Sequence, residues 1–422
     1  MAAIETHRAI EAVWKIESAR VIAALARTVH DVGVAEELAQ DALVAALEQW
    51  PESGIPQNPG AWLTTTAKRR AIDYFRRNAR IDRKHEILAR ELAERESKVP
   101  DLAAAMDDTI GDDLLRLIFI ACHPVLSKDA RVALTLRMLG GLTTGEIARA
   151  YVVAESAIAQ RIVRAKRALA EAQVPFEVPK GDEFTARLSS VLQVIYLIFN
   201  EGYSATSGDD WMRPALCQEA LRLGRILAEP VRNEPEAHAL VALMEIQASR
   251  EKARVDESGE PILLLNQDRT RWDRLLIHRG MRALERVEQL GGKRGVYALQ
   301  AAIAACHARA VTADETDWMR IAALYAELAE VAPSPIIELN RAVAVGMASG
   351  PAAGLELVER LSDNPALESY HLLPSVRGDL LEKLGRLEEA RTEFEKAASM
   401  TRNECERSFL LKRARTCSDH AK

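Results

Sequence analysis

Hydrophobic residues return at helical spacing along most of the chain. One stripe, between residues 61 and 80, consists of Leu63, Ala67, Ala71, Tyr74 and Phe75. A second stripe, between residues 155 and 170, consists of Ile158, Ile162, Ala165 and Leu169. Side chains three or four positions apart share one face of an α-helix. With few glycines and prolines to interrupt it, the pattern predicts an all-α fold.

Turn-forming residues divide this helical pattern. The segment PFEVPKGD at residues 175–182 holds two prolines and a glycine, which predicts a domain boundary before a helical C-terminal domain over residues 182–422. The last hundred residues carry a weak repeat in which Gly354 matches Ala390, an offset of 36 residues. This period is close to the roughly 34 residues of a tetratricopeptide unit, so it favours a short helical solenoid. An irregular helical domain with coincidental spacing explains it almost as well.

The charges of the chain are unevenly placed. The 422 residues include 56 Lys+Arg and 62 Asp+Glu, a net charge of -6. Residues 1–175 hold 24 of each sign, so the acidic surplus lies in residues 176–422. Residues 64–90 carry nine basic and three acidic residues and precede a strongly acidic run that ends at Asp113. Local patches of charge set the electric field at a phosphate, so residues 1–175 can bind nucleic acid although the chain as a whole is acidic. The acidic residues 176–422 are expected to contact protein.

Several classes of protein are disfavoured. The five cysteines are scattered without a C-x-x-C pair, which argues against a disulfide framework and a zinc site. The N-terminus does not have the pattern of a signal peptide, and the apolar stretch at residues 191–199 is too short to span a membrane. We therefore expect a cytoplasmic protein with no membrane contact, no cofactor and no metal site.

The predicted helix at residues 61–80 is cationic opposite its apolar stripe. Its basic residues include Lys68, Arg69, Arg70, Arg76 and Arg77. Acidic residues are too few for ion pairing along the helix to explain these charges, and Trp62 lies on the basic side. A basic face with an exposed aromatic ring suits phosphate contacts and stacking on an unpaired base. A solvated surface helix is the alternative interpretation.

A second motif begins at Thr143 and Glu146, which have the spacing of a capping box. After a turn at residues 151–153, a second helix is expected from about Glu155 to Ala170. The residues opposite or beside its apolar stripe are Ser156, Ala157, Gln160, Arg161, Arg164 and Arg167. Two such helices describe a helix-turn-helix, whose second helix enters the major groove and reads bases through Gln and Arg. Any helical hairpin with a basic second helix can mimic this pattern.

These residues together resemble a known family. The segment VAEELAQDAL at residues 34–43, with Trp62-Leu63 and AIDYFRR at 71–77, resembles region 2 of the bacterial sigma-70 family in its extracytoplasmic-function branch. Residues 141–148 (GLTTGEIA) through 161–169 are similar to region 4. The segments NEGY at 200–203 and QDRTRWD at 267–273 resemble the extension of the subgroup with a fused tetratricopeptide-like domain. The chain departs from the family pattern at Val152, where the family often has glycine, and at Ala159, where lysine or another polar residue is common.

The resemblance implies an RNA polymerase sigma factor, with core polymerase and promoter DNA as partners. The fused domain suggests that regulation is at least partly internal, and its acidic surplus favours contact with polymerase, with a protein regulator or with the basic faces of the first part of the chain. It implies region 2 over residues 10–80, an acidic linker over 81–113, region 4 over 114–172 and a tetratricopeptide-like extension over 182–422. Core polymerase would be bound by an exposed face comprising Glu36, Glu37, Gln40, Asp41 and Val44. The melted -10 element would be held by Asn58, Trp62, Lys68, Arg69, Arg70, Arg76 and Arg77. The -35 element would be read by Ser156, Ala157, Gln160, Arg161, Arg164 and Arg167.

Three other readings remain open. A one-component helix-turn-helix regulator with a ligand- or protein-binding helical domain leaves the Trp62 helix unexplained, and a tetratricopeptide scaffold leaves both basic helices unexplained. An enzyme would use the charged residues Asp268, Arg269, Arg271, Asp273 and His278, but their spacing matches no nucleophile elbow, P-loop or metal motif. We expect no enzyme, and we expect the charges around Trp272 to form ion pairs that fix helix packing.

Overall fold

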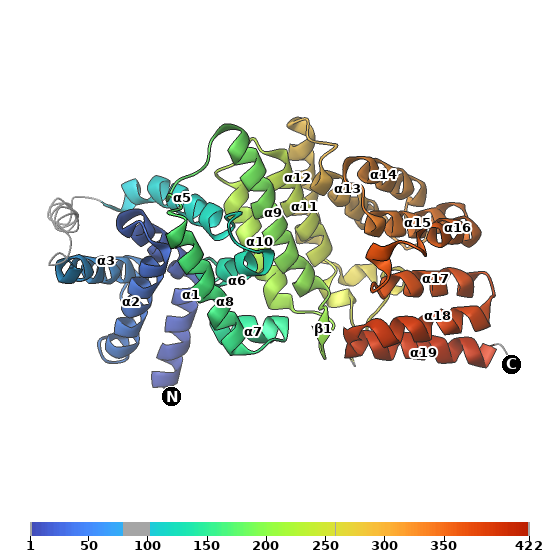
Figure 1. Ribbon diagram of the computed structural model, residues 1–422, viewed down its shortest axis with the longest axis horizontal. Coiled ribbons are helices and arrows are strands. Elements are labelled where there is room, and N and C mark those ends of the chain that lie inside the picture. Colours follow the sequence, from blue (N-terminus) through green and yellow to red (C-terminus); the bar gives the residue numbers. More distant parts are fainter. Residues whose placement is uncertain (1, 79–101, 258, 421–422) are drawn as a thin grey trace. The chain divides into compact units, whose positions relative to one another are not determined.

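The computed structural model describes residues 2–78, 102–257 and 259–420. These residues are helical apart from short connections and two short strands, which confirms the all-α fold (Figure 1). The chain divides into two compact units, unit 1 (Met1–Ile195) and unit 2 (Tyr196–Lys422). The division lies inside helix α9 (Gly181–Tyr203) and not at residue 182, where the prolines and glycine only separate two helices.

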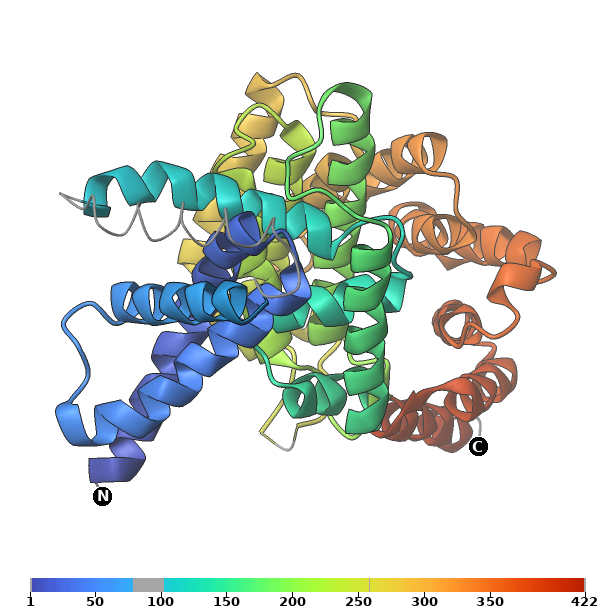
Figure 2. The ribbon, with the colours of Figure 1, turned by 60° about the vertical axis from the view of Figure 1, so that its left-hand side comes forward.

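Unit 1 begins with three helices that pack against one another: α1 (Ala2–Val29), α2 (Val32–Ser53) and α3 (Pro59–Asn78) (Figure 2). Asp31 caps α2 by accepting hydrogen bonds from the backbone of Gly33 and Val34. The predicted α3 stripe faces the core, since Leu63, Ala67, Ala71 and Phe75 are buried and Tyr74 is half-buried. Helix α2 continues through Pro51 to Ser53, so residues 54–58 connect it to α3.

Among the described residues, α3 is followed by α5 (Leu102–Ala121), α6 (Lys128–Met138), α7 (Thr144–Tyr151) and α8 (Glu155–Glu171). Thr143 and Glu146 form the predicted capping box at the start of α7. Part of the expected acidic linker, residues 81–101, lies outside the described residues, and residues 102–113 belong to α5. Asp113 is buried and pairs with Arg27 at 3.1 Å, so it is not part of an exposed connector.

The first half of α9 belongs to unit 1 because its side chains anchor there. Arg187 donates to the backbone carbonyl of Phe119 at 2.9 Å, and Arg131 donates to Ser190 at 2.6 Å. The ring of Phe184 lies 5.5 Å from that of Phe119. A domain boundary drawn at residue 182 would therefore remove part of the packing of unit 1.

Unit 2 is a succession of helices in which neighbours along the chain pack together. Its α-helices are α10 (Pro214–Ala228), α11 (Pro235–Ala248), α12 (Arg274–Gln289), α13 (Val296–Arg309), α14 (Trp318–Val331), α15 (Pro335–Ser349), α16 (Pro351–Leu361), α17 (Leu372–Lys383), α18 (Leu387–Met400) and α19 (Glu404–His420). Its 3-10 helices are η1 (Glu251–Ala253), η2 (Leu264–Asn266), η3 (Arg269–Arg271) and η4 (Pro365–Leu367). The strands β1 (Ser207–Gly208) and β2 (Arg402–Asn403) pair in parallel and join the start of the unit to its end.

The two copies of the predicted repeat share one core. Leu339 and Ala342 from α15 are buried in the same cluster as Ala390 and Phe394 from α18. Gly354 is needed for a close helix contact, because a Cβ there would lie 2.8 Å from the Ala342 carbonyl oxygen. Successive helical hairpins, α15 with α16 and α17 with α18, thus form the expected helical C-terminal domain.

Candidate nucleic-acid interface

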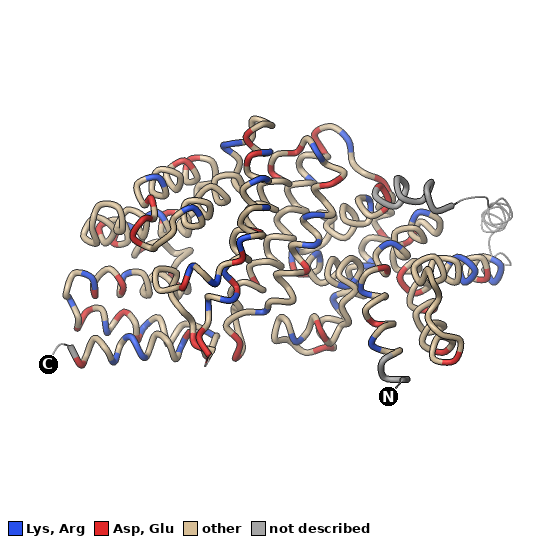
Figure 3. Tube along the Cα trace, turned by 180° about the vertical axis from the view of Figure 1, so that it is seen from behind, with Lys and Arg blue, Asp and Glu red and all other residues tan. Residues whose placement is uncertain are grey.

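The outer face of α3 carries four exposed arginines and the half-buried Lys68. Arg69, Arg70, Arg76 and Arg77 are exposed, while Lys68 is half-buried (Figure 3 marks the charged positions). Within the described residues, none of these four arginines forms an ion pair, although Arg77 donates to the Asp73 carbonyl at 3.3 Å. The predicted basic face is therefore present in the fold, with its four arginines exposed.

Trp62 differs from the freely exposed ring that the sequence predicted. It is half-buried and meets Trp50 edge to face, with ring centroids 5.2 Å apart. Trp50 is only 1% exposed, so it fixes the neighbouring ring in place. Exposed Asn58 caps α3, since its side-chain oxygen accepts a hydrogen bond from Ala61 N at 3.0 Å. The cap uses the oxygen of the Asn58 amide and not its NH2 group.

Helix α8 presents the polar face expected of a recognition helix. Ser156, Ala157, Gln160, Arg164 and Arg167 are exposed, and Arg161 is half-buried. Arg161 pairs with Asp129 at 3.6 Å and Arg167 with Glu171 at 2.7 Å, both at positions where solvent makes such pairs weak.

The turn before α8 explains why the family prefers glycine there. Val152 has φ 50° and ψ 50°, in the left-handed region. This conformation strains a β-branched side chain, whereas glycine adopts it freely.

Helix α2 exposes only part of its predicted acidic face. Glu37, Asp41 and Val44 are exposed and Gln40 is half-buried. The expectation that Glu36 is exposed is wrong: this residue is 2% exposed.

Two cations from later helices cover the Glu36 carboxylate. Arg137 of α6 donates to its Oε1 at 2.7 Å, and Lys166 of α8 forms an ion pair with its Oε2. Gln40 donates to the same carboxylate. The sequence does not predict that Arg137 and Lys166 meet Glu36, because residues so far apart along the chain have no helical spacing that would indicate a contact. A further pair links Lys15 of α1 with Glu146 of α7 at 3.2 Å.

The charged residues around Trp272 cap helices, whereas ion pairs were expected. Asp268 accepts from Thr270 N at 2.9 Å at the start of η3, and Asp273 accepts from Leu275 N at 2.9 Å at the start of α12. His278 is exposed. Among the described residues no three His, Cys, Asp or Glu side chains are grouped as metal ligands. None of the helices described is both long and apolar enough to cross a membrane.

A basic helix beside a fixed aromatic ring, followed by a helix-turn-helix, defines a helical DNA-binding protein. The family described as sigma-70 region 2 matches residues 16–81, and that described as sigma-70, region 4 matches residues 116–169. A family of unknown function, DUF6596, matches residues 187–288. The chain is also 41% identical, over 393 residues, to the uncharacterized protein R00370 of Rhizobium meliloti (strain 1021). That similarity covers 93% of this chain and 92% of the relative.

The chain therefore belongs to the sigma-70 family, as a sigma factor of the extracytoplasmic-function type with a C-terminal extension. Sigma-70 regions 2 and 4 are the parts that bind core RNA polymerase and promoter DNA in transcription initiation.

Proposed function

We propose that this sigma factor directs promoter-specific initiation by holding the melted -10 strand on α3 and reading the -35 element with α8. The uncompensated arginines of α3, next to the fixed ring of Trp62, carry this proposal. Unstacking a base costs a few kcal/mol, so a surface that binds only the open strand favours melted DNA. Trp62 supplies the stacking surface, Asn58 a polar contact, and Lys68, Arg69, Arg70, Arg76 and Arg77 bind phosphates.

On α8, we assign base contacts to Gln160 and Arg164, the exposed residues of suitable chemistry with no ion pair among the described residues. Ser156 and Ala157 would lie at the groove edge, and Arg161 and Arg167 would contact phosphates after leaving their weak pairs.

The contact with core polymerase is proposed for the exposed face of α2, formed by Glu37, Asp41 and Val44. Glu36 and Gln40 would join this contact only after Arg137 and Lys166 have left them, because a carboxylate covered by two cations is not available to a partner. Unit 1 as described is therefore a closed arrangement in which region 4 covers part of region 2. Opening of this arrangement would precede or accompany holoenzyme formation.

The same proposal divides the chain into region 2 over residues 10–80, a linker over 81–113 whose residues 102–113 form the start of α5, region 4 over 114–172 and the extension from 182, whose first residues in α9 pack in unit 1. We further propose that the extension regulates holoenzyme formation through a protein partner. The support is its acidic surplus of 38 Asp+Glu against 32 Lys+Arg in residues 176–422.

In vitro transcription with purified core polymerase and a promoter library tests the function. Promoter-specific initiation is the expected result, whereas specific DNA binding without core polymerase would favour a one-component regulator. Replacing Arg76 and Arg77 with alanine should impair strand opening, read by permanganate footprinting, more than closed-complex binding. Arg8→Ala, at an exposed position of α1, is the control and should leave both unchanged. Equal losses in opening and closed-complex binding would contradict the assigned role of α3.

A further inference from the structure

Unit 2 contains a ladder of alternating guanidinium groups and aromatic rings that no function assigned above uses. The Arg254 Cζ lies 3.5 Å from the ring centroid of Tyr203, and the Arg250 Cζ lies 5.7 Å from the same centroid. Arg250 is also 5.8 Å from the Trp272 ring, and Arg269 is 5.0 Å from it. The three arginines are only 7–8% exposed, so three cations are buried side by side.

Carboxylates balance these charges only in part: Glu251 and Glu315 act on Arg254 and Arg269 through space and oppose the lowering of their pKa. Within the described residues, none of the three arginines forms an ion pair with a carboxylate. Buried charges in proteins are normally paired, because leaving water is costly for an isolated ion. Burial, reinforced by the charge of Arg250, lowers the pKa of both Arg254 and Arg269. The cluster is thus an interior site with an excess of positive charge.

Among the described residues, two of the arginines donate side-chain hydrogen bonds and the third, Arg250, has only its two aromatic contacts. Arg269 donates to the carbonyls of His307 at 2.6 Å and Ala310 at 2.8 Å, which close the C-terminal end of α13. Arg254 donates to the Tyr203 carbonyl. Arg250 donates no side-chain hydrogen bond to any described residue, and its Nε is fully enclosed without a partner.

Other enclosed nitrogen atoms around Arg250 also lack partners. They are Arg269 Nε, Trp272 Nε1 and His307 Nδ1. Roughly 90% or more of buried polar groups are hydrogen-bonded, so unpartnered N–H groups gathered in one place offer donors to a bound acceptor, either water or an anion. Cation–π contacts explain why guanidinium groups tolerate this interior, but they supply no acceptor for the N–H groups.

We propose that the extension binds a phosphate group at Arg250, between Tyr203 and Trp272. A tetrahedral dianion suits this place, because it offers several acceptor oxygens and neutralises more of the three positive charges than a carboxylate can. The group is either free phosphate or the phosphate of a small metabolite, since both present the same oxygens. The inference is independent of the promoter contacts proposed for unit 1.

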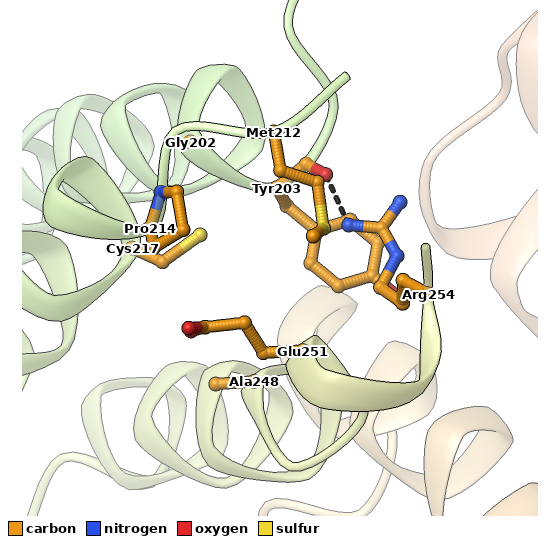
Figure 4. A pocket seen from close by; sticks show the side chains of 8 residues that line it. All are labelled: Gly202, Tyr203, Met212, Pro214, Cys217, Ala248, Glu251 and Arg254. Carbon is orange, nitrogen blue, oxygen red and sulfur yellow. Dashed lines mark hydrogen bonds between the residues drawn. The ribbon is translucent and has the colours of Figure 1, made fainter. Parts of the chain in front are cut away.

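The neighbouring cavity at Arg254 is not this site. Figure 4 shows the Arg254 guanidinium lying across the Tyr203 ring and the Glu251 side chain lining the same cavity. The cavity volume is about 10 Å3, which admits no more than one water. A carboxylate at such close quarters also repels an anion. We therefore place the phosphate group at Arg250, which forms no ion pair with a carboxylate among the described residues.

Isothermal titration calorimetry on the full chain tests the proposal, with inorganic phosphate, glucose 6-phosphate, AMP and acetate at constant ionic strength in chloride. Saturable one-site binding of inorganic phosphate is expected, with acetate at least tenfold weaker. Arg250→Met should weaken phosphate binding by about tenfold or more, the scale of a lost charge-assisted hydrogen bond. Arg271→Met, which removes an exposed cation of η3, is the matched control and should change affinity less than twofold. A phosphorylated metabolite that binds tenfold tighter than inorganic phosphate would identify the metabolite as the source, and equal binding would identify free phosphate.

Three results would overturn the proposal: no saturable binding of any phosphate compound, equal binding by Arg250→Met, or acetate binding as tightly as phosphate. If Arg250→Met does not fold, Arg250→Lys replaces it, because it keeps the charge and loses the planar fork of donors. Phosphate should raise the melting temperature of the wild-type chain, and this increase should be reduced in Arg250→Lys. An undiminished increase in that variant would place the phosphate elsewhere.

Discussion

Replacing Lys166 with glutamine removes one of the two cations that cover Glu36, and we expect this change to strengthen binding to core RNA polymerase. In the closed arrangement of unit 1, Lys166 of α8 pairs with the Glu36 carboxylate on α2, the helix proposed to meet the polymerase. Loss of the pair weakens only the closed arrangement, because Lys166 and Glu36 separate when region 4 leaves region 2.

The size of the effect follows from the burial of the pair. The Glu36 side chain is 3% exposed and the Lys166 side chain 18%, so solvent screens their interaction little. A hydrogen bond to a charged group contributes about 1.5–3 kcal/mol, which shifts the balance between closed and open forms roughly 10- to 150-fold. While the closed form predominates, the apparent affinity for core polymerase rises by the same factor, because only the open fraction binds. Arg137 still holds Glu36 at 2.7 Å, which favours the lower end of this range.

The assay is a fluorescence anisotropy titration of the labelled full chain with core polymerase, without DNA. Arg164→Gln is the matched control, because it makes the same charge change at an exposed position of the same helix and should leave affinity unchanged. Glu36→Gln tests whether the carboxylate is itself a contact, since it releases both cations and also loses the acid. Unchanged or weaker binding by Lys166→Gln would refute the reasoning that the closed arrangement competes with polymerase.

Three further predictions concern stability. Burial, together with Arg250 and Arg269, lowers the pKa of His307 to about 3. Near pH 5 the unfolded chain therefore binds a proton at His307 that the folded chain does not bind. The free energy of unfolding should accordingly be about 2 kcal/mol lower at pH 5 than at pH 6.5. Urea titrations should show a smaller loss for His307→Gln, and an equal loss would exclude His307 as its cause. Val152→Gly should raise the unfolding free energy of unit 1 by about 1 kcal/mol by relieving φ 50°, and no gain would show that valine is unstrained there. Gly354→Ala should cost about 1–3 kcal/mol in denaturant unfolding because its Cβ would meet the Ala342 carbonyl at 2.8 Å, and a neutral result would mean that α15 and α16 can separate freely.

Local patterns predicted the elements well because their causes are local. The stripe from Leu63 to Phe75 lies on one side of a helix whatever it packs against, and Thr143 with Glu146 closes a capping box within four residues. The caps at Asp268 and Asp273 were also visible in principle, since an aspartate before a helical segment is a typical N-cap. The arginines beside these aspartates make ion pairs an equally natural prediction from sequence, and only the fold shows the bonds to backbone N–H groups.

Tertiary packing decided what the sequence could not show. Glu36 is separated from Arg137 by 101 residues, so no spacing indicates that these side chains meet. The prolines at residues 175–182 correctly end a helix, but the compact units divide later because Arg187 of α9 binds the Phe119 carbonyl. Arg250 reads as an ordinary surface cation in the sequence, and only the folded chain brings Tyr203 and Trp272 to either side of it.

The buried arginines also change the meaning of the charge count. Residues 176–422 hold 32 basic and 38 acidic residues, but four of the basic ones, Arg187, Arg250, Arg254 and Arg269, are buried against only Glu201 and Glu245 among the acids. The net charge that residues 176–422 present to solvent is therefore more negative than the -6 of their full count. Such a surface disfavours DNA binding and favours a basic protein partner. A phosphate bound at Arg250 would leave that outer surface unchanged, because it neutralises interior charge. A bound phosphate could therefore act on a partner only by shifting helices that contact the cluster. These are α12, which Trp272 precedes, and α13, whose end Arg269 holds.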